Sequence, residues 1–226
     1  MEEKAGREQQ GAQVDLPPGA IQVLEGSTFM LSDSLGDVLP ESVAGLYHED
    51  TRHLNRFVLT VNGAAPVVLT SREVDTYSAT FFTTNPALDG IPAKSLTIRR
   101  HRFVGEGMRE TIGIRNHLRE PVNLEVRLSC GADFADLFEV KGKEFHKAGR
   151  TTTQHDPGHS LLAFAYEHDT FRVATKVHAS IDARVDDDDL VWRVRIEPLS
   201  EWHTGIEVLV NLDDEVKEPT HETFGE

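Results

Sequence analysis

Cysteine is almost absent from this chain of 226 residues, in which Cys130 is the only one. A single thiol excludes an intrachain disulfide and a zinc site built from several cysteines, and it suits a reducing compartment. The chain also has no apolar run near the roughly 20 residues that a membrane helix needs. Its first ten residues, MEEKAGREQQ, contain no apolar core of a secretory signal. We therefore expect a cytoplasmic protein that makes no membrane contact.

Basic residues are scarce as well, because 23 lysines and arginines face 38 aspartates and glutamates, for a formal charge of −15. Nucleic acids and anionic membranes are bound through Lys and Arg, so this balance argues against both as partners. Aromatic residues make up 7% of the chain, and the only tryptophans are Trp192 and Trp202. We expect both indoles in the core. An exposed one would favour carbohydrate binding, because sugar rings stack on flat aromatic faces.

The sequence is rich in alternation of apolar and polar residues with a period of two. The alternation is cleanest in residues 95–103, 108–116 and 121–130, and it is typical of half-buried antiparallel strands. Further strands are predicted over residues 21–24, 28–31, 57–61, 67–69, 73–83, 161–166, 171–177, 180–185, 190–196 and 202–212. About a dozen strands with little helix predict an all-β fold, a large two-sheet antiparallel β-sandwich.

The predicted sandwich domain covers residues 20–212. Residues 1–19 are polar and end in Pro17-Pro18-Gly19, so we expect a disordered arm there. Residues 213–226 are acidic and polar, which fits a tail or the start of a linker to a helical domain that this chain lacks. Inside the sandwich, Asn62-Gly63 predicts a hairpin from residues 57–61 back through 67–69. The aspartate run at 186–189 predicts a solvated hairpin tip.

Residues 26–57 mix short apolar runs with turn formers and a dense set of charges. Five carboxylates and a single arginine, Arg52, lie between residues 29 and 54, and two glycines and a proline interrupt any helical period. The apolar residues of the stretch argue against disorder, so we expect an ordered polar loop. We also expect Arg52 to tie this loop together through a planar ion pair with one of three carboxylates, Asp33, Asp37 or Asp50.

The same stretch carries a resemblance to a known family. Its pattern is Ser32-Asp33, then Gly36-Asp37, then GLYHEDTRHL at residues 45–54, continued by LTVNG at 59–63, Pro66 and Leu69. From about residue 23 to about residue 145, this pattern resembles the N-terminal domain of bacterial glycogen debranching proteins, which are amylo-α-1,6-glucosidase-like. The DTR segment with its preceding glycine is the more specific part of the pattern.

The resemblance implies a β-supersandwich that precedes a helical (α/α)6 barrel, and it implies that the barrel holds the glycosidase carboxylates. The expected function is therefore a non-catalytic domain, with no catalytic residue of its own, that supports such a barrel in cis or in trans and aids α-glucan binding. A homo-oligomer is a further expectation. Four residues are expected to contact sugar at the rim of the barrel: Tyr47, Asp50, Thr51 and Arg52.

Two other functions stay open at this stage. One is a self-sufficient carbohydrate-binding module, which an exposed aromatic platform would favour. The other is a sandwich enzyme of the aldose-mutarotase kind with a His acid and a Glu base, for which the candidates are His101, His117 and Glu110.

No cofactor and no metal site are expected. His48 and His53 are five residues apart rather than the four that place two zinc ligands on one helix face. His155 and His159 flank a Pro-Gly pair that favours an ordinary turn. The aspartates at 186–189 lack the ligand spacing and the glycine of a calcium loop.

Overall fold

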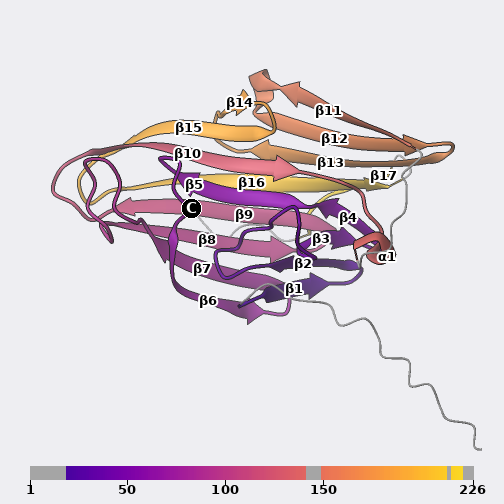
Figure 1. Ribbon diagram of the computed structural model, residues 1–226, viewed down its shortest axis with the longest axis horizontal. Helices are drawn as coiled ribbons and strands as arrows, with labels where there is room; N and C mark the ends of the chain where they lie inside the picture. The colour runs from indigo at the N-terminus through magenta and orange to yellow at the C-terminus, as the bar shows by residue number, and fades with distance from the viewer. Residues whose placement is uncertain (1–18, 141–148, 213–214, 221–226) are drawn as a thin grey trace, which may run out of the picture.

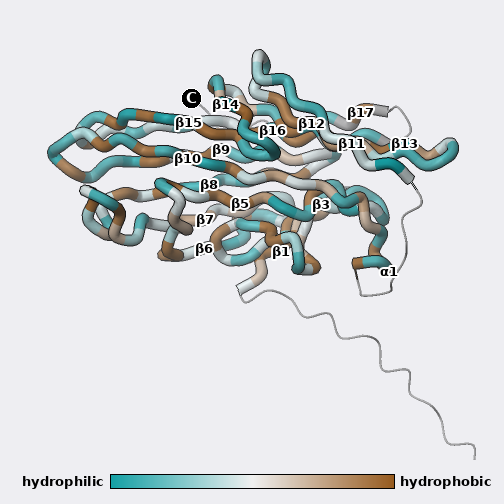
Figure 2. The backbone as a smooth tube through the Cα atoms, turned by 45° about the horizontal axis from the view of Figure 1, so that its top comes forward, coloured by the Kyte–Doolittle hydropathy of each residue, from teal (hydrophilic) through white to brown (hydrophobic). Residues whose placement is uncertain are grey.

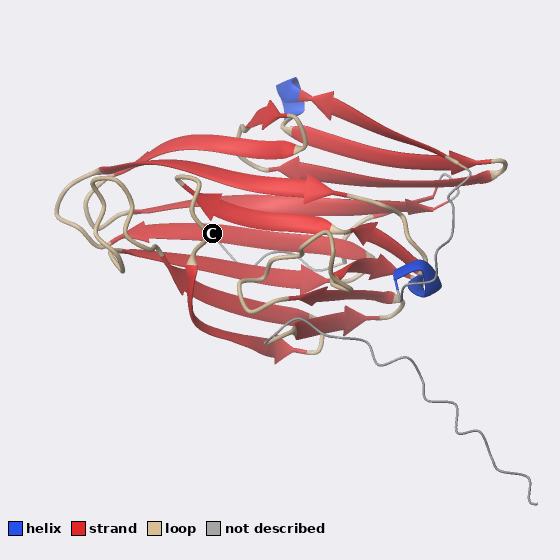
Figure 3. Cartoon of the chain, viewed as in Figure 1, coloured by secondary structure: helices blue, strands red, loops and turns tan. Residues whose placement is uncertain are grey.

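The computed structural model describes residues 19–140, 149–212 and 215–220. The arm expected at 1–19 lies outside the described residues except for Gly19, and so do residues 213–214 and 221–226 of the expected tail. Strands dominate the described part, in which only α1 (Leu137–Val140) and the 3-10 turn η1 (Pro157–His159) are helical (Figure 3). None of the helices in these ranges has the length and apolar character that a membrane crossing requires.

The broadest layer is an antiparallel nine-stranded sheet, which we call the large sheet (Figure 1). From one edge to the other its strands are β11 (Arg150–Asp156), β12 (Leu161–His168), β13 (Phe171–Ala179), β16 (Glu201–Leu212), β9 (Gly107–Asn116), β8 (Leu96–Val104), β7 (Ser78–Thr84) and β6 (Val67–Asp75). The ninth strand, β17 (Glu215–Lys217), pairs with the end of β16, so part of the expected tail is a strand.

Two four-stranded antiparallel sheets make up the rest of the fold. The N-terminal sheet consists of β1 (Ile21–Glu25), β2 (Thr28–Ser32), β3 (Gly45–His48) and β4 (Thr51–Leu54), in that order. The cover sheet has the order β14 (Arg184–Asp186), β15 (Asp189–Ile196), β10 (Val122–Gly131) and β5 (Arg56–Val61).

Both small sheets lie against the same face of the large sheet. Thr175 of β13 bonds His53 of the N-terminal sheet, while Arg100 of β8 lies 5.4 Å from the ring centre of Phe57 in the cover sheet. Thr175 and Arg100 both lie at the every-second positions of their strands that are buried, and most of those positions are apolar. Both side chains therefore point to the inner side of the large sheet. The predicted all-β antiparallel sandwich is confirmed, and its second layer is divided into two sheets.

The core follows from the alternation in the sequence. On β10 the positions from Val122 to Cys130 are buried at every second residue, and on β9 Met108, Ile112 and Ile114 are fully buried. Figure 2 shows hydrophobic and hydrophilic positions alternating along the strands in this way. A shift of one residue in the pairing would turn each apolar set to water, so the register is strongly determined.

The Asn62-Gly63 prediction is right about the turn and wrong about the hairpin. Asn62 and Gly63 have φ values of 48° and 74°, as a tight two-residue turn requires. However, the return is limited to one bridge between Val61 and Ala64, and the chain then leaves for the far edge of the large sheet as β6. The pairing that the turn was expected to supply to β5 comes from β10 instead.

Three other expectations need correction. Residues 73–83 are not one strand, because the chain turns between Asp75 and Ser78 and β6 pairs with β7. Residues 180–185 contribute only the start of the short strand β14. The polar stretch 26–57 is largely strand rather than loop, and its loop is limited to residues 33–44. The hairpin tip at 186–189 is confirmed, since Asp186 and Asp189 pair across it.

Candidate functional site

The family-like motif at residues 45–54 is a β-hairpin formed by β3 and β4. Its turn holds Glu49, with φ of 52°, and the exposed Asp50. Gly45 must lack a side chain, because a Cβ there would lie 2.6 Å from both Cδ of Arg52 and the carbonyl oxygen of Leu54. The spacing from the glycine to the arginine therefore reflects a close crossing of the Arg52 stem over the opposite strand.

Arg52 binds four oxygens in a fixed fork. Its Nε and Nη2 donate to the two carboxylate oxygens of Asp133 at 3.1 and 2.5 Å. Its Nη1 donates to the carbonyls of Ser42 and Ala44 at 2.8 and 3.3 Å. Burial lowers the pKa of Arg52, but the hydrogen bond and charge of Asp133 more than offset this, so its pKa ends above the ordinary value.

The predicted structural role of Arg52 is confirmed, but the predicted partners are wrong. Its carboxylate partner is neither Asp33, Asp37 nor Asp50; it is Asp133, 81 residues further along the chain. The reason is geometric: Asp50 lies in the hairpin turn, whereas the segment after β10 passes directly beside β4, as the bridge between Thr51 and Asp136 shows.

The other three predicted sugar-contact residues lie in different environments. Tyr47 is 2% exposed, donates its hydroxyl to the Val43 carbonyl at 2.8 Å and stacks on Phe29 with ring centres 4.6 Å apart. Thr51 is half-buried, and Asp50 is exposed. Tyr47 and Arg52 are cross-strand partners. Of the four, Asp50 is the exposed one and Thr51 is partly accessible, while Tyr47 and Arg52 hold the hairpin in place.

A second arginine cluster, buried between the layers, holds the start of the loop 33–44. Glu110 accepts hydrogen bonds from Nε of Arg100 at 2.6 Å and Nε of Arg102 at 2.7 Å. Arg100 also bonds Asp37 and the Leu35 carbonyl, and Arg102 donates to the Gly36 carbonyl at 2.6 Å. We call Asp37, Arg100, Arg102 and Glu110 the buried quartet. Its two cations and two anions balance, which is the condition under which charges are tolerated in a core.

Burial and ion pairing oppose each other in the quartet. Burial raises the pKa of Asp37, and the nearby Arg100 cation offsets only part of that. Burial also raises the pKa of Glu110, but its two arginines outweigh burial and leave the pKa below the ordinary value. Burial lowers the pKa of Arg102, whereas Glu110 and Asp37 bring the pKa of Arg100 above its usual range. The two arginines thus favour the charged form of Glu110, which is closed to water.

The loop 33–44 is consequently fixed at both ends. Oδ1 of Asp33 accepts from the backbone amides of Leu35 and Asp37, both at 2.8 Å, which closes a tight turn. Gly36 takes φ of 80° there, and the Phe81 ring lies 3.0 Å from the place a Cβ would occupy. The quartet binds this turn, and Arg52 binds Ser42 and Ala44 at the other end. The Ser-Asp…Gly-Asp and DTR parts of the motif therefore both hold the loop 33–44 in a fixed conformation.

The structure does not assemble the acid–base pair considered for a mutarotase-like enzyme. Both carboxylate oxygens of Glu110 accept from arginines in the core. His101 lies between Arg100 and Arg102 on β8 and so points to the opposite face of the sheet. His117 follows the end of β9, is exposed and bonds the Thr97 hydroxyl at 2.7 Å.

The tryptophans form no exposed platform. Trp192 is 2% exposed and donates its indole N–H to the Ile181 carbonyl at 3.1 Å. Trp202 is half-buried and packs against it, with ring centres 5.8 Å apart. The expected core position is confirmed for Trp192, whereas Trp202 is only partly buried.

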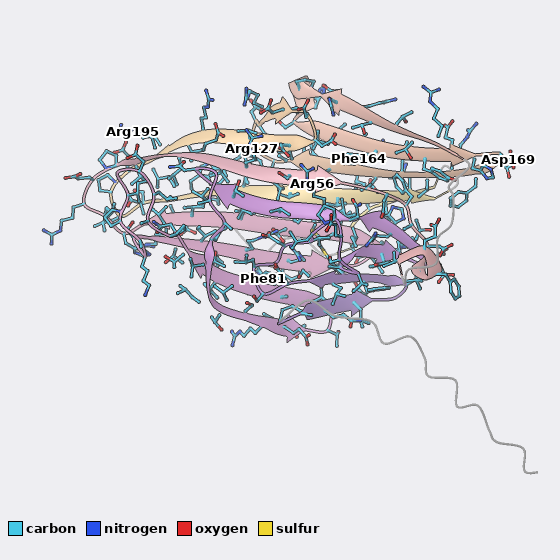
Figure 4. The ribbon with its side chains drawn as sticks, in the orientation of Figure 1. Arg56, Phe81, Arg127, Phe164, Asp169 and Arg195 are labelled. Atoms are coloured by element: carbon cyan, nitrogen blue, oxygen red, sulfur yellow. The ribbon has the colours of Figure 1, made fainter. Side chains whose placement is uncertain are left out.

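Several other polar residues have structural partners. His53 is fully buried: the Thr175 hydroxyl donates to its carbonyl, so Nδ1 of His53 donates to that hydroxyl oxygen, and Nε2 is left without a partner. Asp189 binds Arg56 at 3.0 Å and Arg127 at 2.5 Å, and both arginines are labelled in Figure 4 on the cover sheet. Within the described ranges, no group of three or more metal-ligating side chains is found.

The sequence did not reveal that Asp133 is the partner of Arg52. It also did not reveal that Arg100 and Arg102 both pair with Glu110. For the arginines a signal was present, because both fall on the apolar parity of their strand, as Glu110 does on the next. Three charged residues at core positions of adjacent strands imply a buried ion cluster. Nothing in the sequence around Asp133 indicates that Arg52 is its partner.

Two solved structures show only weak similarity. A heparan sulfate lyase HepC mutant from Pedobacter heparinus is 10% identical, with a TM-score of 0.44, and the match covers 97% of this chain and 44% of that one. Heparinase III is 11% identical, with a TM-score of 0.35, over 84% of this chain and 34% of that one. The chain thus spans less than half the length of either. No curated protein matches the sequence.

The family comparison is more specific. The family described as the N-terminal domain of (some) glycogen debranching enzymes matches residues 23–207. The match extends well past residue 145, where the resemblance was expected to fade, and it includes β12, β13, β15 and most of β16. With the motif hairpin, the quartet and both layers inside the matched range, this chain belongs to the family of N-terminal domains of glycogen debranching enzymes.

Proposed function

We propose that this chain is the non-catalytic β-sandwich domain of a glycogen debranching enzyme-like glycoside hydrolase, in which it supports an (α/α)6-barrel catalytic domain and aids α-glucan binding. The observation that carries the proposal is the family match over residues 23–207. The finer assignment, hydrolysis of α-1,6-linked glucose by the parent protein, rests on the resemblance of the DTR motif. A cytoplasmic location and a homo-oligomer belong to the same proposal.

The motif hairpin supports a role at the rim of the partner domain. Arg52 and Tyr47 are used internally to hold β3 and β4, so the turn they carry presents Asp50 and Thr51 in a fixed position. Residues held on rigid strands place hydrogen-bonding groups more accurately than free loops do. In this arrangement Asp50 accepts from sugar hydroxyls, and Arg52 and Tyr47 act through the position of the turn.

The test of the non-catalytic role is glucose release. The purified chain is incubated with an α-1,6-branched dextrin, with a debranching enzyme as the positive control, and released glucose is measured over time. We expect no release above the buffer blank. Steady turnover that scales with the concentration of the pure chain would overturn the proposal.

The rim role is tested in the parent protein that carries the barrel. Asp50→Asn is expected to raise KM for branched dextrin several-fold and leave the melting temperature unchanged, because Asp50 is exposed. Asp169→Asn is the matched control, since Asp169 is also an exposed aspartate in a hairpin turn, at the tip of β12 and β13 (Figure 4). If Asp50→Asn and Asp169→Asn have the same KM, the hypothesis that the motif hairpin contacts substrate at the rim is wrong.

A further inference from the structure

A cavity of about 320 Å³ opens between the loop 33–44 and the start of β6. Its polar lining includes Asp33, Asp37 and Ser42, and its apolar lining includes Leu39, Pro66 and Val68. The volume lies at the lower end of the about 300–1,000 Å³ typical of small-molecule sites. None of the residues proposed for the rim lines it, so it is a separate place on the domain.

The walls of this cavity are rigid before any ligand arrives. The quartet and Arg52 fix the two ends of the loop. The Ser71 hydroxyl of β6 donates to the Ser34 carbonyl at 2.6 Å and so joins the loop to the second wall. A site that is ordered in advance loses little conformational entropy on binding.

Two carboxylate oxygens in the lining remain available as acceptors. Oδ1 of Asp33 takes the amides of Leu35 and Asp37, and Oδ1 of Asp37 takes the Leu59 amide and Arg100. Neither Oδ2 accepts a hydrogen bond from any residue in the described ranges. The Asp37 side chain is only 4% exposed, so its orientation is held by the protein and not by solvent. A carboxylate fixed in this way accepts strong hydrogen bonds from hydroxyl groups.

The charge of the cavity selects against anions. Arg100 already balances Asp37, whereas Asp33 has no ion-pair partner among the described residues, so one negative charge is left facing the ligand. Leu39 and Val68 are 52% and 38% exposed and offer apolar contact to the C–H faces of a sugar ring. A neutral polyhydroxy ligand fits both features, whereas the negative charge of a sulfated or uronic acid sugar is repelled by Asp33.

We propose that this cavity binds a glucosyl unit of a neutral α-glucan, with Asp33 and Asp37 accepting from its hydroxyls and Leu39 and Val68 against its apolar face. The choice of α-glucan rests on the proposed function, while the preference for neutral over anionic sugar follows from the cavity itself. The site would hold a branch of the polymer on the domain, at a place separate from the motif hairpin.

The experiment is a titration of the ¹⁵N-labelled full chain with maltotriose, followed by amide chemical shifts. We expect saturable shifts in the loop 33–44 and in β6. Asp33→Asn keeps an Oδ1 to accept from the two backbone amides and turns the free acceptor into a donor, so it is expected to weaken binding about tenfold with the fold intact. Leu39→Ser is expected to weaken it severalfold without touching the core.

Asp156→Asn serves as the control, because Asp156 also accepts a backbone amide through Oδ1, from Gly158 at 3.1 Å, but lies at the end of β11, outside the cavity. It should bind maltotriose like the unaltered chain, and an oligosaccharide that contains glucuronate should cause no shifts in the cavity. No shifts with maltotriose, equal binding by Asp33→Asn, equal binding of glucuronate sugar, or shifts produced by CaCl₂ instead of sugar would each overturn the proposal. Those results would leave the non-catalytic role standing, since only glucose release by the pure chain contradicts it.

Discussion

Replacing Glu110 by glutamine tests the idea that the buried quartet holds the core and the loop together. Glu110 is fully buried and makes contacts of 2.6 Å with Nε of Arg100 and 2.6 Å with Nη2 of Arg102. Glutamine has the same shape but no charge. Two guanidinium cations would then share the single carboxylate of Asp37 in the interior, and a guanidinium cannot neutralise itself by losing its proton.

The expected loss is large. Removing one partner of a buried ion pair costs about 3–5 kcal/mol, because an uncompensated charge stays in the core. For a domain of this size each 1 kcal/mol shifts the melting temperature by about 2–4 °C. We therefore expect Glu110→Gln to melt roughly 6–20 °C below the unaltered chain. Amides of the loop 33–44 should also exchange faster, because Arg100 and Arg102 hold the Leu35 and Gly36 carbonyls.

Thermal unfolding followed by circular dichroism measures the effect, and Glu207→Gln is the matched control. Oε1 of Glu207 accepts from Nε and Nη2 of Arg109 at 2.9 and 2.6 Å, but both side chains are about a third exposed. A pair in contact with water contributes only about 0–1 kcal/mol. If the two variants melt at the same temperature, the quartet is no more than a solvated ion pair and the reasoning fails.

Three further predictions concern single residues. Arg52→Lys keeps the charge but loses the fork and the two carbonyl bonds, so urea unfolding should show a loss of about 1–3 kcal/mol; an unchanged midpoint would mean that the fork is not a tie. Burial lowers the pKa of His53 from 6.5 to about 3, so the unfolded chain binds a proton in that range and the folded chain does not. The free energy of unfolding should fall by about 2 kcal/mol from pH 7.5 to pH 5 on this account, and His53→Phe should remove that part of the slope. Gly36→Ala should cost about 1–3 kcal/mol, because φ is 80° and the Phe81 ring is 3.0 Å away; Gly63→Ala, at φ of 74° with nothing within 4 Å, should cost less.

Local sequence patterns predicted the fold class and much of the motif. Period-two alternation identified β8, β9 and β10 nearly to the residue. The turn between β8 and β9 also sets their register, in which Arg102 lies opposite Glu110. The sequence therefore already contained one half of the quartet, and the charged residues at apolar positions were the sign of it.

The tertiary structure alone decided the remaining contacts. Arg52 meets Asp133 across 81 residues, and Arg100 meets Asp37 across 63. β6 does not pair with β5 in the expected hairpin but lies at the edge of the large sheet. Alternation states which face of a strand is buried, but it carries no information on which strand lies beside it or which layer lies above it. The pairs that fix the loop, and the cavity beside it, depend on that order of strands and layers.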